Sequence, residues 1–120
     1  MRWYVTLFSM NALLTAEEDH ALRLFHERLV KYFGNRLKIC KLFGSKARGD
    51  FFGEADLDVL VLIENMCYED KRWAVTCGAD VSLEYLVEIS PLCMSPGKFD
   101  ELLQRERRLA VDIEKEGIPL

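Results

Sequence analysis

The chain has 120 residues, the size of one domain, and half of them are hydrophobic, so a packed core can form and general disorder is excluded. Sixteen basic against twenty acidic residues give a formal net charge of −4. Such a chain lacks the basic footprint that sequence-independent nucleic-acid binding needs. Its longest apolar run, residues 59–63, is far shorter than the roughly 20 residues that cross a bilayer. Nucleic acid and membrane are therefore not expected partners.

The four cysteines are Cys40, Cys67, Cys77 and Cys93, and they form neither a CxxC pair nor a zinc-binding spacing. A chain of this size holds a core without disulfide bridges, so we interpret the cysteines as reduced and mostly buried thiols. Reduced thiols are typical of the cytoplasm, which is the expected location.

Residues 1–14 are mostly apolar, but polar residues interrupt the stretch and no signal-peptide cleavage site follows it. Two interpretations stay open. The segment is an extra strand or tail, or it is upstream sequence with Met10 rather than Met1 as the natural start. We treat residues 1–14 as an extension and residues 15–120 as the domain.

The expected secondary structure alternates between helices and strands. Thr15 and Glu18 form a capping box ahead of the first helix. Pro91 indicates that the last strand lies at an edge, contains a bulge or ends there. The pattern predicts a small mixed sheet with helices packed on it, an α+β fold. The expected elements are a helix over 16–33, a strand over 37–43, a loop or short helical turn over 44–53, a strand over 56–63, a helix over 65–85, a strand over 85–94 and a helical region, in one or two pieces, over 96–116.

Asp56 and Asp58 stand two residues apart at the start of an apolar strand, so both side chains point to one face, about 6 to 7 Å apart along the strand. Two like charges at the start of an apolar strand are unfavourable unless a cation lies between them. Mg²⁺ suits such a pair because it takes carboxylate oxygens and keeps water and phosphate ligands. The alternative is that both aspartates merely cap the solvated start of the strand.

The turn that follows the preceding strand carries anion-binding chemistry. Gly44 lets a phosphate approach the backbone, and Ser45 offers a hydroxyl and a backbone N–H at the start of a turn. Lys46 and Arg48 add positive charge, and arginine suits phosphate better because its planar guanidinium can donate two hydrogen bonds to phosphate oxygens. Alone, this is an ordinary Gly-Ser turn with solvated basic residues. Beside the two aspartates it predicts a site for a nucleoside triphosphate and its metal.

Gly44-Ser45, ten intervening residues and the Asp-x-Asp pair resemble the signature of the DNA polymerase β-type nucleotidyltransferase superfamily. More narrowly, the chain resembles the minimal nucleotidyltransferase (MNT) proteins, to which Ala-Arg-Gly at 47–49 and the segment 113–118 are also similar. The resemblance covers most of the chain from Met10 onward. It implies a short mixed sheet flanked by helices, as in the palm of polymerase β.

The resemblance also implies a reaction. A nucleotidyl group, usually AMP from ATP, is transferred to an acceptor hydroxyl, with two Mg²⁺ ions that hold the triphosphate and activate the acceptor oxygen. The motif residues take two roles: metal ligation by Asp56 and Asp58, and triphosphate binding by Gly44 and Ser45, with Arg48 or Lys46 steadying the phosphates.

In this family a third carboxylate from a later strand is a metal ligand or general base. Glu88, between apolar neighbours inside the expected strand 85–94, is the first candidate; the alternative is an exposed edge position. Glu84, at the end of the preceding helix or in a turn, is the second. Ala55 replaces the serine that many members have before the first aspartate, which we expect to have a modest effect.

Two classes of function remain. MNT proteins often pair with a HEPN-domain toxin, as antitoxins that place AMP on a tyrosine of that ribonuclease, and the resemblance implies such a partner here. Alternatively, the protein is a binding module that neutralises a partner by contact, with a weak or inactive nucleotide site. Antibiotic modification, as in larger relatives, lacks a second domain here. Phe51 and the apolar N-terminus are compatible with a homodimer. The acceptor and the nucleotide base stay open.

Overall fold

The computed structural model describes residues 3–5, 13–49 and 56–120, with only the backbone of 3–5 and of Leu13. Its elements, in chain order, are β1 (Trp3–Val5), β2 (Leu13–Thr15), α1 (Ala16–Phe33), the 3₁₀ turn η1 (Gly34–Arg36), β3 (Leu37–Phe43), α2 (Ser45–Arg48), β4 (Leu57–Ile63), α3 (Tyr68–Tyr85), β5 (Ile89–Met94), α4 (Pro96–Gln104), α5 (Arg108–Glu116) and β6 (Ile118–Pro119).

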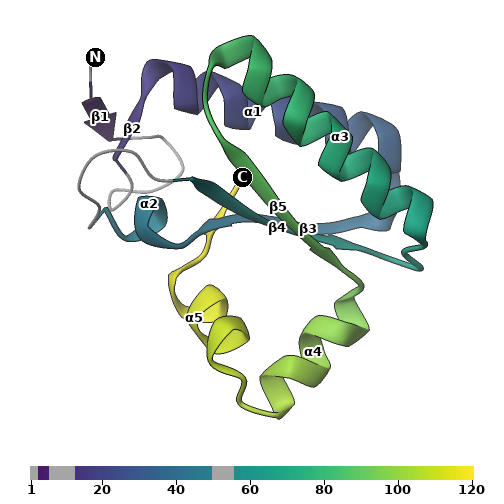
Figure 1. Ribbon diagram of the computed structural model, residues 1–120. Coiled ribbons are helices and arrows are strands. Elements are labelled where there is room, and N and C mark those ends of the chain that lie inside the picture. The colour runs from purple at the N-terminus through teal and green to yellow at the C-terminus, as the bar shows by residue number, and fades with distance from the viewer. Residues whose placement is uncertain (1–2, 6–12, 50–55) are drawn as a thin grey trace.

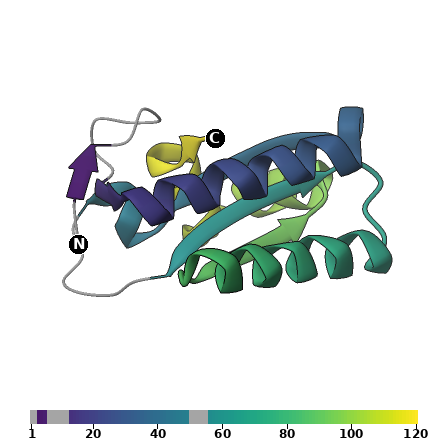
Figure 2. The ribbon, with the colours of Figure 1, turned by 90° about the horizontal axis from the view of Figure 1, so that it is seen from above.

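A four-stranded sheet in the order β5-β4-β3-β6 lies at the centre of the fold. The β4–β5 pair is parallel and the pairs of β3 with β4 and β6 are antiparallel. Helices α1 and α3 cover one face of the sheet, and α4 and α5 cover the other (Figure 1). Seen from above, α1 and α3 lie side by side (Figure 2). The predicted α+β fold with a small mixed sheet is therefore confirmed.

Helix α1 begins and ends where the sequence predicts. The Thr15 N–H donates to Glu18 Oε1 over 2.9 Å, and the Glu18 N–H donates to Thr15 Oγ1 over 3.1 Å, which completes the capping box. The helix ends at Gly34, whose φ of 56° is readily available only to glycine among ordinary residues. Its apolar stripe, including Leu22 and Phe25, is fully buried against the sheet.

Strand β4 is central, as its apolar sequence predicts. Val59 and Val61 belong to the core under α1 and α3, whereas Leu60 and Leu62 belong to the core under α4 and α5. A strand that is covered on both faces needs apolar residues at successive positions rather than alternating ones. Pro91 lies in β5, the edge strand, where the missing N–H costs no ladder hydrogen bond.

Strand β4 begins one residue later than predicted, and two other boundaries differ by more, for reasons of local backbone geometry. Helix α3 begins at Tyr68 rather than at residue 65, because Asn65 has a φ of 53° and Cys67 caps the helix. Strand β5 begins at Ile89 rather than at residue 85. The chain leaves α3 through Leu86, whose left-handed φ of 55° turns it back toward the sheet.

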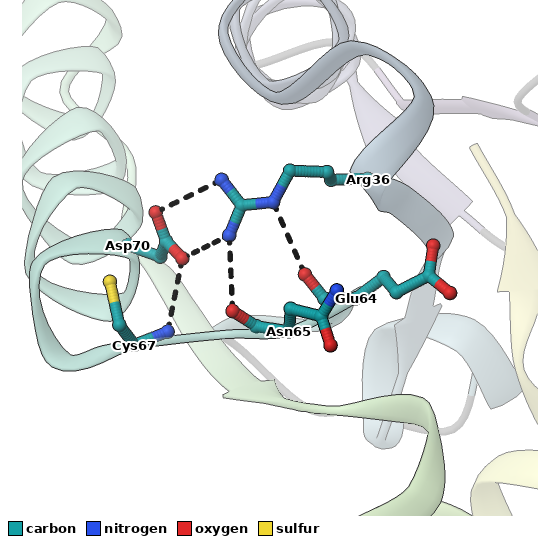
Figure 3. A network of polar contacts seen from close by, with 5 residues as sticks. All are labelled: Arg36, Glu64, Asn65, Cys67 and Asp70. Carbon is teal, nitrogen blue, oxygen red and sulfur yellow. Dashed lines mark hydrogen bonds and ion pairs between the residues drawn. The ribbon is translucent and has the colours of Figure 1, made fainter.

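An arginine joins the start of α3 to the ends of two strands (Figure 3). The Arg36 guanidinium donates to the backbone oxygens of Glu64 and Asn65 over 3.2 and 3.3 Å, and it forms an ion pair with Asp70. Asp70 also accepts the Cys67 N–H over 3.0 Å. Arg36 lowers the pKa of the Asp70 carboxyl below its ordinary value, mainly through this side-chain hydrogen bond.

Short pairings complete the fold, and the sequence does not predict them all. Residues 3–5 pair with 13–15 in a separate two-stranded sheet. The C-terminal strand β6 pairs with Lys41 and Leu42 of β3. The C-terminal helical region splits into α4 and α5. All four cysteines are free and three are buried, as predicted. Among the described residues, no helix has the length and apolarity to cross a membrane.

Candidate functional site

The Gly-Ser turn and the Asp-x-Asp pair meet at one end of the sheet. Because β3 and β4 are antiparallel, the last residue of β3, Phe43, lies opposite Asp58. Gly44 follows with a φ of 79° and a ψ of −160°, a conformation that only glycine adopts without strain. A Cβ placed on Gly44 would lie 2.5 Å from Asp58 Oδ2. The turn therefore lies directly against the Asp58 carboxylate, with no room for a side chain.

The face of the sheet on which Asp58 lies follows from strand alternation. Asp58 precedes Leu60 and Leu62 at intervals of two, and these leucines face α4 and α5. Partial burial raises the pKa of the Asp58 carboxyl above its ordinary value, and the neighbouring charge of Asp56 raises it further. Asp56 itself is exposed. The two carboxylates therefore repel each other in a partly desolvated position.

Glu88 lies just before β5, not inside it as the sequence predicts. Its backbone is nevertheless tied to the site, because the Leu57 N–H donates to the Glu88 carbonyl oxygen over 2.7 Å. Asp58 pairs with Ser90 in the parallel ladder, so the period of two puts Glu88 on the face that Asp58 occupies. The Glu88 side chain is exposed. Across residues 13–49 and 56–120, no three His, Cys, Asp or Glu side chains converge into a metal-binding group.

Glu84, the second candidate for the third carboxylate, lies in the last turn of α3 and is exposed. Helix α3 packs on the face of the sheet opposite to Asp58, as its buried residues Ala74 and Val81 show. Of the two glutamates, the backbone therefore brings Glu88 closer to the aspartate pair.

Lys46 occupies a different environment from the one that the motif suggests. Its side chain is 2% exposed, and its Nζ lies 2.8 Å from Oε2 of Glu18 in α1. The other carboxylate oxygen of Glu18 accepts the Thr15 N–H of the capping box. This buried ion pair fixes the Gly-Ser turn to the start of α1, and the placement does not support Lys46 as a phosphate contact. The sequence shows the capping box but not the second role of Glu18.

Ser45 and Arg48 remain on the accessible side of the turn. Ser45 is the first residue of α2 and is partly exposed. Arg48 is exposed, and its Nη1 lies 3.2 Å from Glu116 Oε2 at the end of α5. This contact is solvent-accessible and therefore weak enough to be exchanged for a phosphate. Phe51 and Ala55 lie outside the described residues.

The donor set fits a hard divalent cation. Carboxylate oxygens are the preferred protein ligands of Mg²⁺. Burial and the neighbouring charge of Asp56 raise the pKa of Asp58, and a bound cation would relieve both effects. Asp56, Asp58 and the nearby Glu88 are the residues that could hold such an ion.

A Gly-Ser turn after one strand lies against an Asp-x-Asp pair at the start of the next, which is the arrangement that the sequence predicts for a nucleotidyltransferase. Comparison with known proteins agrees. A sequence model of the nucleotidyltransferase domain family matches residues 22–117, so this chain belongs to that family. This match confirms the enzyme family that the sequence predicts.

Two relatives and one solved structure are informative. MJ0141 of Methanocaldococcus jannaschii is 42% identical over 52 residues, which are 42% of this chain and about half (52%) of that protein. MJ0604 of the same organism is 30% identical over 84 residues, 70% of this chain and 80% of that protein. Both are provisionally named protein adenylyltransferases. A chain in a crystal structure of a mutant toxin–antitoxin MntA-HpeT shares the fold, with a TM-score of 0.50 and 16% identity over 79% of this chain and 68% of that one.

Proposed function

We propose that this protein is a Mg²⁺-dependent nucleotidyltransferase that moves AMP from ATP to an acceptor hydroxyl on a protein. The single observation that carries the proposal is the contact between Gly44 and the Asp58 carboxylate, which joins the two halves of the motif. The names of the M. jannaschii relatives support AMP as the transferred group and a protein as the acceptor.

The chain's own residues supply binding and proton transfer. Gly44 lets the turn lie directly against the Asp58 carboxylate, and the Ser45 hydroxyl and N–H donate to the phosphate oxygens. Arg48 exchanges its exposed contact with Glu116 for the triphosphate. Mg²⁺ bound by Asp56 and Asp58 would neutralise charge on the phosphates and acidify the acceptor hydroxyl.

Glu88 is the candidate general base. The acceptor oxygen forms a bond to the α-phosphorus, the bond from that phosphorus to the bridging oxygen breaks, and pyrophosphate leaves with the electron pair. The hydroxyl proton moves to the Glu88 carboxylate. The position of Glu88 before β5 and its backbone contact with Leu57 support this assignment.

The acceptor we propose is a tyrosine hydroxyl of a HEPN-domain toxin, which makes this protein the antitoxin. The support is the motif resemblance to MNT proteins and the fold shared with a chain of the toxin–antitoxin MntA-HpeT.

A labelling experiment tests the proposal. The protein is incubated with Mg²⁺, a HEPN-domain protein encoded beside it, and ATP labelled on either the α- or the γ-phosphate. Transfer of the α-label alone, lost in Asp56→Asn, is the expected result. Transfer of the γ-label would instead indicate phosphoryl transfer. Glu88→Gln and Glu84→Gln form a matched pair, and only the former should abolish labelling.

A second candidate is a binding module with an inactive nucleotide site. The observation that favours it is the lack of a converged three-carboxylate group among the described residues. If wild type and Asp56→Asn bind the HEPN-domain protein equally tightly and neither transfers label, neutralisation by contact is the better account.

A further inference from the structure

The end of strand β3 that carries the Gly-Ser turn has a carboxylate on either side. On the β4 side it belongs to Asp58, which lies against Gly44. On the β6 side, Ile118 lies opposite Leu42. Counted back along this antiparallel register, Glu116 comes to the same end of β3. Helix α5, which ends at Glu116, covers the face of the sheet on which Asp58 lies (Figure 1). The Glu116 carboxylate therefore belongs to the surroundings of the candidate site.

Close contacts fix the backbone next to Glu116. The Gly117 N–H donates to the Ile113 carbonyl oxygen over 2.8 Å, and a Cβ placed on Gly117 would lie 2.5 Å from that oxygen. The next residue, Ile118, is buried in the sheet. Glu116 is thus held between a helix and a strand, and its carboxylate can leave the site by rotation of the side chain alone.

The backbone of Arg48 is tied to the Gly-Ser turn. Its N–H donates to the Gly44 carbonyl oxygen over 3.2 Å, and the Gly49 N–H donates to the Ser45 carbonyl oxygen over 2.9 Å. From these two backbone positions Arg48 Nη1 and Glu116 Oε2 meet at 3.2 Å, with side chains that are 41% and 40% exposed. A carboxylate and a phosphate accept the same guanidinium N–H groups, so Glu116 and a phosphate on the turn would compete for them.

We propose that Glu116 sets the nucleotide affinity of the site by competing with the triphosphate for Arg48. The Glu116 carboxylate holds the guanidinium when no nucleotide is bound, the triphosphate displaces it, and it returns when the phosphates leave. This inference rests on the proposed function, because it takes Arg48 as a triphosphate contact. The sign of its effect is distinctive. Removing the charge of a competitor strengthens nucleotide binding, whereas removing a residue that positions Arg48 for the phosphates would weaken it.

Nucleotide affinity without turnover tests the proposal. The probe is the Mg²⁺ complex of α,β-methylene-ATP, which cannot be cleaved between the α- and β-phosphorus, and titration calorimetry measures its dissociation constant. Glu116→Gln should bind about two- to fivefold more tightly than wild type, the range that the loss of an exposed ion pair allows. Circular dichroism checks that each variant is folded.

Glu114→Gln is the matched control and should leave the affinity unchanged. Glu114 is exposed and lies two residues earlier in α5. It has no ion-pair partner within residues 13–49 and 56–120. The two variants therefore remove the same charge from the same helix, and only one of them removes a contact with Arg48.

Arg48→Gln separates competition for the arginine from general repulsion between carboxylate and triphosphate. It should weaken binding of the analogue, and in its background Glu116→Gln should have no further effect, because no guanidinium is left to compete for. General repulsion would instead persist in that background. In the transfer assay, Glu116→Gln should lower the KM for ATP by a similar factor without raising kcat, as expected when ground state and transition state are bound more tightly to the same extent.

The proposal is overturned if Glu116→Gln binds the analogue no more tightly than wild type, if Glu114→Gln gains as much, or if the gain persists without Arg48. A wild-type chain that binds the analogue but shows no Glu116 contrast overturns this inference alone. A wild-type chain that does not bind the analogue overturns the proposed function together with it.

Discussion

At the two ends of the central sheet, the folded structure shifts the pKa of a carboxyl group in opposite directions. Beyond the C-terminal end of β4, Asp70 of α3 is buried, paired with Arg36 and hydrogen-bonded to a backbone N–H, and its pKa is lowered. At the N-terminal end of β4, Asp58 is partly buried beside Asp56, and its pKa is raised. Neither aspartate forms an ion pair with the described residues.

The difference separates a stabilising network from the site that we propose to be functional. The network around Arg36 and Asp70 satisfies its own charges and joins two strands to a helix (Figure 3). The aspartate pair at the other end keeps an unfavourable charge in the folded state. Perturbed, uncompensated carboxylates of this kind are typical of binding and catalytic sites. The comparison can be tested by substitutions at either end, which should have opposite effects on stability.

The largest expected effect is that of Asp58→Asn on activity. Removing one of the two carboxylates that we propose as metal ligands should lower AMP transfer on the order of a thousandfold, which corresponds to about 4 kcal/mol of transition-state stabilisation. The free energy of unfolding at pH 7 should not fall, because the variant also removes the repulsion from Asp56. Label transfer and urea unfolding measure the two quantities. A variant that loses both activity and stability would show that Asp58 is structural.

Lys46→Met should destabilise the fold by about 3 kcal/mol, because it leaves the carboxylate of Glu18 buried without its cation. The control is Lys38→Met. Lys38 pairs with Glu64 over 3.2 Å at an exposed position, and a pair of this kind contributes about 0 to 1 kcal/mol. Urea unfolding of both variants measures the contrast. Equal losses would mean that the burial of Lys46 has no energetic consequence.

Gly44→Ala should cost about 2 kcal/mol through backbone strain alone. It should also displace the Asp58 carboxylate, which the new methyl group would contact. Gly97→Ala is the control, because Gly97 lies in α4 with open space around it, and alanine is favoured over glycine inside a helix. We expect the first variant to lose stability and ATP binding and the second to lose neither. Preserved ATP affinity in Gly44→Ala would argue against a phosphate at this turn.

At the opposite end, Asp70→Ala should cost roughly 1 kcal/mol, the ordinary value of a lost helix cap. The pH dependence is the sharper test. The lowered pKa of Asp70 gives stability that is present above its ordinary value of 3.8 and is lost as the pH falls through the folded-state pKa. Asp58 has the reverse sign, since acid removes its unfavourable charge. As the pH is lowered, the free energy of unfolding should therefore fall less in Asp70→Ala than in wild type.

Much of the fold follows from the sequence because strong local signals agree with the packing. Helix α1 has a capping box, an apolar stripe and a terminal glycine, and its bounds match the prediction. Strand β4 is apolar on both faces, and it is central. Strand β6 lies beyond prediction, because two residues that include Pro119 form no periodic pattern and are held only by pairing with β3.

The sequence likewise predicts only part of the candidate site. Spacing alone predicts that the Gly-Ser turn and the two aspartates meet, because adjacent antiparallel strands bring the end of one to the start of the next. Spacing cannot tell which of two nearby basic residues turns inward, and it is Lys46 that pairs with Glu18. It also cannot foresee the left-handed Leu86, which delays β5 and places Glu88 before the strand. Both differences depend on tertiary contacts or backbone geometry that single residues do not encode.

The pairing of β6 with β3 bears on the order in which the protein can form during synthesis. Ile118 lies opposite Leu42, so the β3–β6 pair forms only after the chain has been made as far as Ile118. The strands that carry the aspartate pair and its neighbours, β3 to β5, are complete by Met94, and so are both helices of the α1 and α3 layer. On the ribosome, the half of the molecule that bears the candidate site can therefore assemble before α4 and α5 arrive to cover the other face.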